Sequence, residues 1–226
     1  MMMMTIRRFI FLFLLLGISF VSYSQKDDFG LWFDVSGDVK LVKKLELDLS
    51  AELRTFQNAS KVREAFLEAG LTYKFNKYIS ASGSYRFTEF LEKDDSYHPR
   101  HKWFADITGK LPLWNFNISG RVMFQQRFKT YYKNENDKIP DEHARIKLEI
   151  NYNIPSFPVN PFIASEIFFP VLTDKEKGID RLRLMAGLEY KISKRHSVEL
   201  EYIYQRDYLP HINDINVISL NYKFKF

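Results

Sequence analysis

Apolar and polar residues alternate with a period of two along most of this chain. The last segment shows the pattern well: every second residue from Phe226 back to Ile218 is apolar or aromatic, and the residues between them are lysine, asparagine or serine. Successive side chains of a β-strand point to opposite faces, so this period predicts a strand with one apolar and one polar face.

The same alternation recurs in about eleven segments, which are separated in turn by tight reversals and by longer, charged loops. These segments are residues 29–40, 45–56, 65–75, 79–88, 101–108, 116–125, 144–152, 162–171, 181–190, 198–205 and 216–226. No domain linker or low-complexity tract interrupts them. The chain is therefore expected to form one all-β domain, a single antiparallel up-and-down β-barrel.

The number of strands is expected to be even, because single-chain bacterial membrane barrels normally have an even number. A count of eleven therefore points to ten or twelve. The weakest alternation lies in the segment from Phe29 to Lys40. This segment either conceals an additional crossing or does not form a complete strand of the wall.

Strand length and aromatic placement favour a transmembrane barrel, with apolar residues outside, over a soluble secreted β-barrel that binds a small apolar ligand inside. Strands of ten or more residues cross a bilayer at a tilt, and aromatic residues gather near both ends of the strands, as at two membrane interfaces. Near the tight turns these are Tyr73, Phe75, Tyr78, Trp114, Phe116, Tyr152 and Tyr190, and near the longer loops they are Phe87, Phe128, Tyr131, Tyr132, Phe169, Tyr204 and Tyr208.

The N-terminal segment has the features of a secretory signal peptide. Arg7 and Arg8 precede an apolar run from Phe9 to Val21, and serines follow at the two positions that a signal peptidase reads. The run is shorter than the roughly twenty apolar residues of a spanning helix. We expect cleavage after residue 24, which leaves residues 25–226 as the barrel domain.

Composition excludes several classes of chemistry. The chain has no cysteine, which excludes disulfides, thiolate chemistry and an N-terminal lipid anchor. The net charge of +5 includes the two arginines of the signal segment, so the remaining chain is only mildly basic. A nucleic-acid partner, which requires a basic patch of one sign, is not expected.

With the apolar faces turned to lipid, the polar faces enclose charges of both signs. The candidates are Glu52, Arg54, Glu68, Arg86, Asp106, Arg121, Arg145, Lys147, Glu149, Glu166, Arg181, Arg183, Glu189, Glu199 and Glu201. Isolated buried charges are costly, so these residues either pair and plug a narrow structural barrel or line a water-filled pore for small solutes. Glu199 and Glu201, with Arg181 and Arg183 on the preceding strand, are the predicted constriction.

A lipid-modifying outer-membrane enzyme is the alternative from another class. It would place a histidine and a serine near the membrane rim. His101 is expected to face outward there, but no serine lies at a matching depth. His98 and His211 with nearby aspartates could form a cation site, although solvated loop charges explain them as well. We predict no catalytic residues, no metal and no cofactor.

The end of the chain resembles the signal that bacterial outer-membrane barrels present to their assembly machinery. Its aromatic positions are Tyr222, Phe224 and Phe226. This resemblance implies that the barrel-assembly machinery and outer-membrane lipid are partners, and that the bacterial outer membrane is the location.

Short motifs also make the mature chain similar to domain-of-unknown-function family 2490, a family of uncharacterised bacterial outer-membrane barrels. They are Phe29-Gly30-Leu31-Trp32, Glu52-Leu53-Arg54, Tyr85-Arg86, Arg181-Leu182-Arg183 and the terminal aromatic strand. The resemblance implies a barrel fold and an outer-membrane location, and it implies no activity.

Overall fold

The computed structural model describes residues 27–132, 135–171, 178–209 and 212–226. The predicted signal peptide, residues 1–24, lies outside these ranges. The strands are β1 (Asp28–Val42), β2 (Leu45–Phe56), β3 (Lys61–Lys74), β4 (Ile79–Leu91), β5 (Tyr97–Leu113), β6 (Phe116–Lys129), β7 (Asp141–Tyr152), β8 (Val159–Pro170), β9 (Arg181–Lys191), β10 (His196–Asp207) and β11 (Asn213–Lys225), and a short 3₁₀ helix, η2 (Glu135–Lys138), precedes β7. Within the described ranges, no helix is long and apolar enough to cross a membrane.

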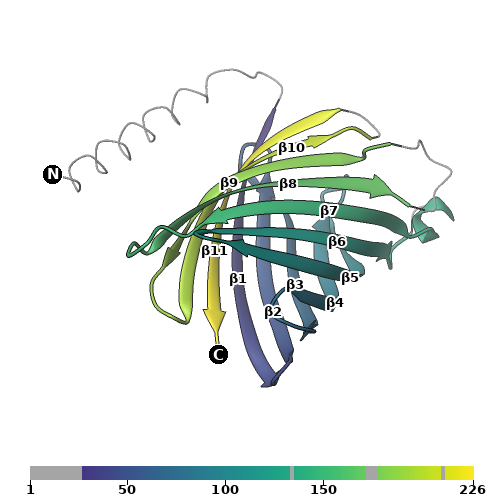
Figure 1. Ribbon diagram of the computed structural model, residues 1–226. Helices are drawn as coiled ribbons and strands as arrows, with labels where there is room; N and C mark the ends of the chain where they lie inside the picture. The colour runs from purple at the N-terminus through teal and green to yellow at the C-terminus, as the bar shows by residue number, and fades with distance from the viewer. Residues whose placement is uncertain (1–26, 133–134, 172–177, 210–211) are drawn as a thin grey trace.

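The eleven strands close into a barrel in which each strand pairs with its neighbours in sequence (Figure 1). All of these hairpin pairs are antiparallel. The barrel closes through β1 and β11, which run parallel in a register from Asp28 opposite Ile215 to Asp38 opposite Lys225. The expectation of an even number of strands is therefore wrong. A parallel ladder satisfies the backbone hydrogen bonds of both terminal strands, so closure does not require an even count.

The weakly alternating first segment forms a complete wall strand. β1 pairs with β2 from Trp32 opposite Arg54 to Val42 opposite Leu45, with one register shift near Lys40. Its alternation is weak in the sequence because Trp32 is an apolar residue on the inward face, whereas Gly37 is a small residue on the outward face. Neither residue matches the pattern of its neighbours, yet both continue the strand.

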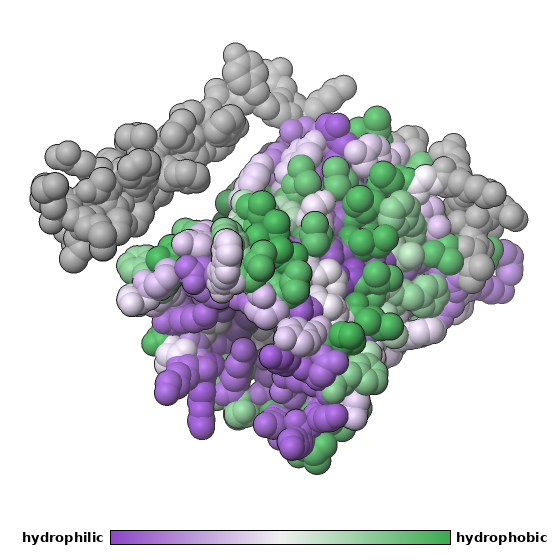
Figure 2. Space-filling view, viewed as in Figure 1, coloured by the Kyte–Doolittle hydropathy of each residue, from purple (hydrophilic) through white to green (hydrophobic). Residues whose placement is uncertain are grey.

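Apolar side chains cover the outside of the barrel. Leu67 and Ile107 are 63% and 62% exposed, whereas Glu166 and Arg183 are 3% and 9% exposed. Figure 2 shows hydrophobic residues over the outer wall and hydrophilic residues around the hollowed end of the barrel where the C-terminus lies. This inverted burial is typical of a membrane barrel, and it excludes the alternative with an apolar interior that binds an apolar ligand.

The hairpin connections expose aromatic residues at the rims. Trp114 adopts a left-handed conformation, with a φ of 54°, in the two-residue link between β5 and β6, and it is 94% exposed. Tyr73, Phe75 and Tyr78 are also exposed near the β3–β4 turn, and Tyr131 and Tyr132 are exposed beside the longer β6–β7 loop. Both predicted groups of aromatic residues therefore include side chains that face the surroundings of the barrel.

Candidate functional site: the charged lumen

The lumen contains two neighbouring cavities that share three wall residues. The turn-side chamber, of about 390 Å³, is lined by Asp34, Asp38, Asp48, Glu52, Glu68, Glu201, Arg121, Lys147 and Lys223, among others. The loop-side chamber, of about 120 Å³, is lined by Glu64, Arg100, Lys102, Arg127, Arg145 and Arg181, among others. Arg54, Arg86 and Arg183 line both chambers and form the boundary between them.

Charge is unevenly distributed between the two chambers. Eight lysine or arginine side chains line the loop-side chamber, and Glu64 is the only described carboxylate on its wall. Six carboxylates line the turn-side chamber together with six cations, three of which belong to the boundary. The wall of the lumen therefore changes from basic at the longer loops to balanced in charge at the tight turns.

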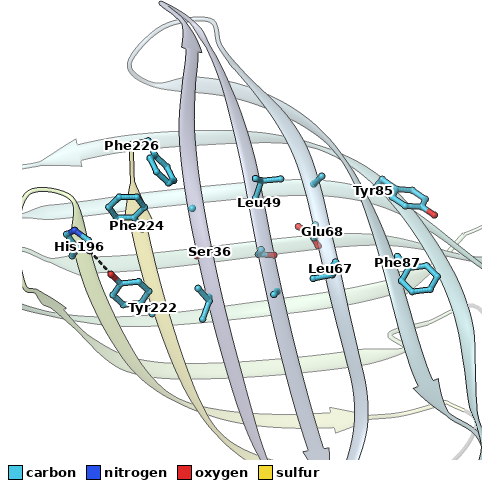
Figure 3. A pocket seen from close by; sticks show the side chains of 15 residues that line it. Ser36, Leu49, Leu67, Glu68, Tyr85, Phe87, His196, Tyr222, Phe224 and Phe226 are labelled. Carbon is cyan, nitrogen blue, oxygen red and sulfur yellow. Dashed lines mark hydrogen bonds between the residues drawn. The ribbon is translucent and has the colours of Figure 1, made fainter.

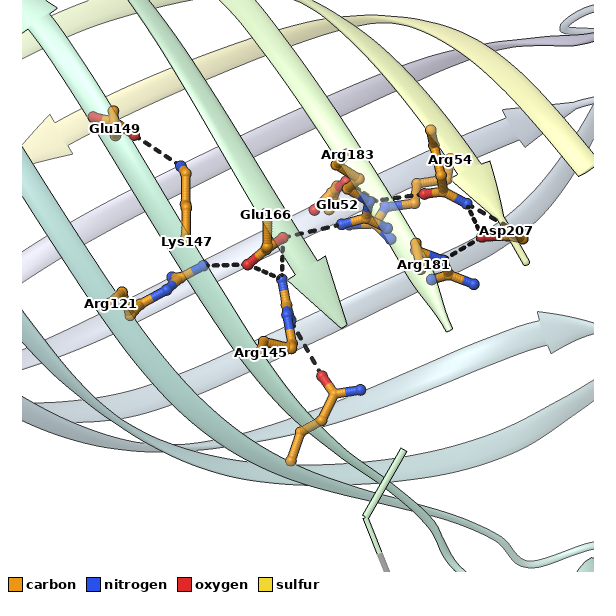
Figure 4. A network of polar contacts seen from close by, with 12 residues as sticks. Glu52, Arg54, Arg121, Arg145, Lys147, Glu149, Glu166, Arg181, Arg183 and Asp207 are labelled. Carbon is orange, nitrogen blue, oxygen red and sulfur yellow. Dashed lines mark hydrogen bonds and ion pairs between the residues drawn. The ribbon is translucent and has the colours of Figure 1, made fainter. Parts of the chain in front are cut away.

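Glu166 is the centre of the densest ion-pair cluster (Figure 4). Its carboxylate accepts hydrogen bonds from Arg145 at 2.7 and 2.8 Å and from Arg121 at 3.0 Å, and Arg183 lies 3.8 Å away. The four side chains come from β6, β7, β8 and β9, so the cluster ties four adjacent strands together. One carboxylate for three guanidiniums leaves the cluster positive.

A second cluster surrounds Arg54 on the opposite wall. Arg54 donates to Glu52 at 2.5 Å and to Glu64 at 2.9 Å. Its guanidinium carbon lies 3.9 Å from the centroid of the Trp32 ring, and the Arg183 guanidinium carbon lies 5.2 Å from the same ring. Trp32 thus stacks beneath two boundary arginines and helps to fix their positions by cation–π contact.

An apolar cluster fills the part of the lumen between β8 and β11. Ala164, Met185, Ile203 and Val217 are all less than 9% exposed, and Trp32 and Ile215 pack against them. The alternation pattern did not predict this cluster, because Ile203 and Val217 occupy the polar phase of their strands. These residues occupy one side of the lumen. The remaining passage therefore runs along the side where the charged residues lie.

Most of the predicted lumen residues form pairs on the interior wall. Arg86 binds Glu68 at 2.6 Å, and Lys147 binds Glu149 at 2.8 Å. The remaining pairs are Arg181 with Asp207, Glu199 with Lys223 and Asn221, Glu189 with Asn160 and Lys191, and Asp106 with Ser82 and Thr108. Glu201, which is 8% exposed, has no ion pair among the described residues.

The four residues of the predicted constriction are not brought together. Arg181 and Arg183 lie opposite Asp207 and Gln205 on β10, whereas Glu199 and Glu201 lie opposite Glu189 and Gly187. The two pairs are thus separated along the barrel, because an antiparallel register places residues from the start of one strand beside those from the end of the next. The boundary between the chambers is formed by Arg54, Arg86 and Arg183 instead.

Several charged wall residues did not appear among the sequence candidates. Arg100, Lys102 and Arg127 have the same inward phase as Arg86, since Lys102 lies opposite both Arg86 and Arg127 in the ladder. Lys102 lies on the polar side of the fifth predicted segment, residues 101–108, and extending this segment by one residue would have found Arg100. Glu64 likewise has the inward phase of Glu68 and lies one residue before the third predicted segment.

The terminal aromatic residues lie on the outer face. Tyr222, Phe224 and Phe226 border an external groove of about 720 Å³ that also includes Leu49 and Leu67 (Figure 3). The rings of Phe224 and Phe226 meet edge to face, with centroids 4.2 Å apart. Recognition of this end by an assembly machinery stays a prediction.

Three of the described histidines, His98, His101 and His196, have aromatic neighbours. His101 faces outward, as expected from its phase, where its Nδ1 shares a hydrogen bond with the Tyr85 hydroxyl and its ring stacks on Phe128. His98 stacks on Tyr131 and lies 3.5 Å from Asp94, whereas His211 lies outside the described residues. The described part of the chain contains no group of three or more side chains that could hold a metal ion.

Solved structures with a similar fold include two porins and the β domain of an autotransporter. The NanC porin is 13% identical with a TM-score of 0.48, and the alignment covers 76% of this chain and 86% of that one. The β domain of the Bordetella autotransporter BrkA is 12% identical with a TM-score of 0.45, covering 77% and 81%. The KdgM porin is 12% identical with a TM-score of 0.43, covering 78% and 91%. At these identities the likeness concerns the fold alone.

None of the curated proteins matches this chain. The profile of a family described as a protein of unknown function, DUF2490, matches residues 29–216. This match confirms the resemblance based on the short motifs. The chain belongs to the DUF2490 family.

Proposed function

We propose that this protein is a narrow passive pore for small solutes in the bacterial outer membrane. The outward apolar band, the exposed aromatic residues near both rims and the enclosed charges support a membrane location. Export by the predicted signal peptide, contact with outer-membrane lipid and assembly through Tyr222, Phe224 and Phe226 belong to the same proposal.

The observation that carries the pore proposal is that the two chambers are neighbours with a shared boundary of side chains. They share Arg54, Arg86 and Arg183, so long side chains, rather than backbone, separate them. Eleven tilted strands enclose a cylinder with a radius on the order of 10 Å, which leaves a narrow passage once inward side chains are placed. Charged residues along such a passage favour water and small ions over apolar solutes.

A structural barrel without transport is the second candidate. The Glu166 cluster and the buried apolar cluster around Val217 favour it, because both reduce the open part of the lumen. In this case the charged side chains serve only to neutralise one another. An enzymatic role has less support, since the neighbours of His101 on the outer face are the rings of Tyr85, Phe87 and Phe128.

Planar-bilayer conductance of the refolded mature chain tests the pore. We expect discrete current steps, and a larger conductance for Arg183→Ala, because this change removes a boundary side chain. Arg195→Ala, in the exposed β9–β10 turn, is the matched control and is expected to leave conductance unchanged. Absence of current above background, or equal conductance of all three proteins, would favour the structural barrel.

A further inference from the structure

The wall of the loop-side chamber carries a row of three cations on neighbouring strands. Lys102 on β5 lies opposite Arg86 on β4 and opposite Arg127 on β6, and all three point inward. Directly opposed residues on one face have Cβ atoms about 5 Å apart, and like charges at this distance repel. The row therefore requires negative charge nearby.

The described carboxylates supply this charge unevenly. Arg86 has Glu68 at 2.6 Å, and Arg127 is paired with Asp141. Lys102 forms no ion pair with any described residue, and its Nζ lies 5.0 Å from the centroid of the Phe104 ring. The central cation of the row is thus the one without a carboxylate partner.

Two arginines of the same chamber also have an unused donor. The Nε atoms of Arg100 and Arg145 are buried and have no hydrogen-bond partner within the described part of the chain. Their side chains are only 10% and 12% exposed. A buried N–H group without an acceptor is destabilising, so a ligand that supplies oxygen acceptors would stabilise this arrangement.

The shape and donors of the chamber define the chemical class of such a ligand. A volume of about 120 Å³ holds a few water molecules or one small oxyanion, since a water molecule takes up about 30 Å³. Guanidinium groups donate in pairs to carboxylate and phosphate oxygens, and an ammonium adds a compact charge. Gln125 accepts from Arg145 through its carbonyl oxygen, so its amide group remains a further donor.

We propose that the loop-side chamber is a binding site for a small oxyanion, a phosphate or carboxylate group, held by Lys102, Arg100 and Arg145. This inference deepens the proposed function by naming the solute class, and it rests on that function only in requiring that solutes enter the lumen. The anion replaces the missing carboxylate beside Lys102. A solute that enters from the side of the longer loops reaches this basic chamber before the turn-side chamber, whose charges are balanced.

Calorimetric titration of the refolded mature chain with inorganic phosphate tests the site, with chloride at equal ionic strength as the reference. We expect saturable phosphate binding that Lys102→Gln weakens at least about tenfold. Lys110→Gln is the matched control, because Lys110 lies on the same strand but outside the chamber, in the exposed part near the β5–β6 turn. If Lys102→Gln does not refold, Arg100→Gln serves in its place with the same expectation.

The outcomes separate this inference from the pore. Phosphate binding without any bilayer current would support the site and contradict the pore. Bilayer current without phosphate binding would support the pore and overturn the site. Equal weakening by the Lys102 and Lys110 variants, or binding no stronger than that of chloride, would also overturn it, because the charge of the lumen as a whole would then explain the result.

Discussion

Replacing Glu166 by glutamine removes the carboxylate that three guanidiniums share. Glu166 is 3% exposed and lies within 3.0 Å of Arg145 and Arg121, so no water compensates for the loss. Removing one partner of a buried ion pair typically costs about 3–5 kcal/mol, because the remaining charges stay buried. Glutamine retains one acceptor, so we expect a loss of about 3 kcal/mol in the free energy of unfolding.

Urea unfolding of the protein refolded in lipid vesicles, followed by tryptophan fluorescence, measures this loss. Glu149→Gln is the control, because Glu149 has a single ion-pair partner among the described residues, Lys147, and its side chain is 32% exposed. A pair of this kind contributes about 0–1 kcal/mol. Equal losses for the two variants would refute the reasoning. Adding Arg145→Gln to Glu166→Gln should recover part of the loss, since one uncompensated guanidinium is then absent.

Three further predictions use the same unfolding measurement. Gly187→Ala should cost about 1–3 kcal/mol, because an added Cβ would lie 2.6 Å from the Phe162 ring; Gly120→Ala, where no atom lies within 4 Å, should be neutral or slightly stabilising, and equal effects would contradict the packing argument. Leu148→Arg, on the outer face at mid-strand, should cost about 2–4 kcal/mol, whereas Leu113→Arg at the rim should cost about 0–1 kcal/mol; the reverse order would argue against lipid around this wall. Glu201→Gln should maintain or increase stability, because it removes a buried charge that forms no ion pair with any residue that the structure describes. A loss above about 1 kcal/mol would show that the carboxylate has a stabilising partner.

The face of each strand was predictable, because a period of two is a property of the backbone. Once Leu45 and Leu47 are placed outward, Glu52 and Arg54 must point inward, and burial confirms this phase. The family resemblance followed from motifs that lie on these strands. The fold class was therefore accessible from single residues and their spacing.

The partners inside the lumen were not predictable, because they depend on register and on strands that are distant in sequence. Arg121 on β6 binds Glu166 on β8, two strands away in the barrel, although 45 residues separate the two in the chain. Arg54 meets Glu64 because the β2–β3 register places the two residues directly opposite each other, and neither segment alone shows this register. Neither β1 nor β11 alone carries a sequence signal that the two strands pair in parallel. The expectation of an even number of strands was wrong for this reason.

The parallel contact between β1 and β11 determines where the two ends of the described chain emerge. Because both strands run in the same direction, Asp28 lies beside Asn58 of the β2–β3 loop, whereas Phe226 bonds to the backbone of Asp38 near the opposite rim. In a membrane, the two ends therefore face different compartments. A fusion partner attached ahead of Asp28 and one attached after Phe226 would be exposed on opposite sides of the bilayer.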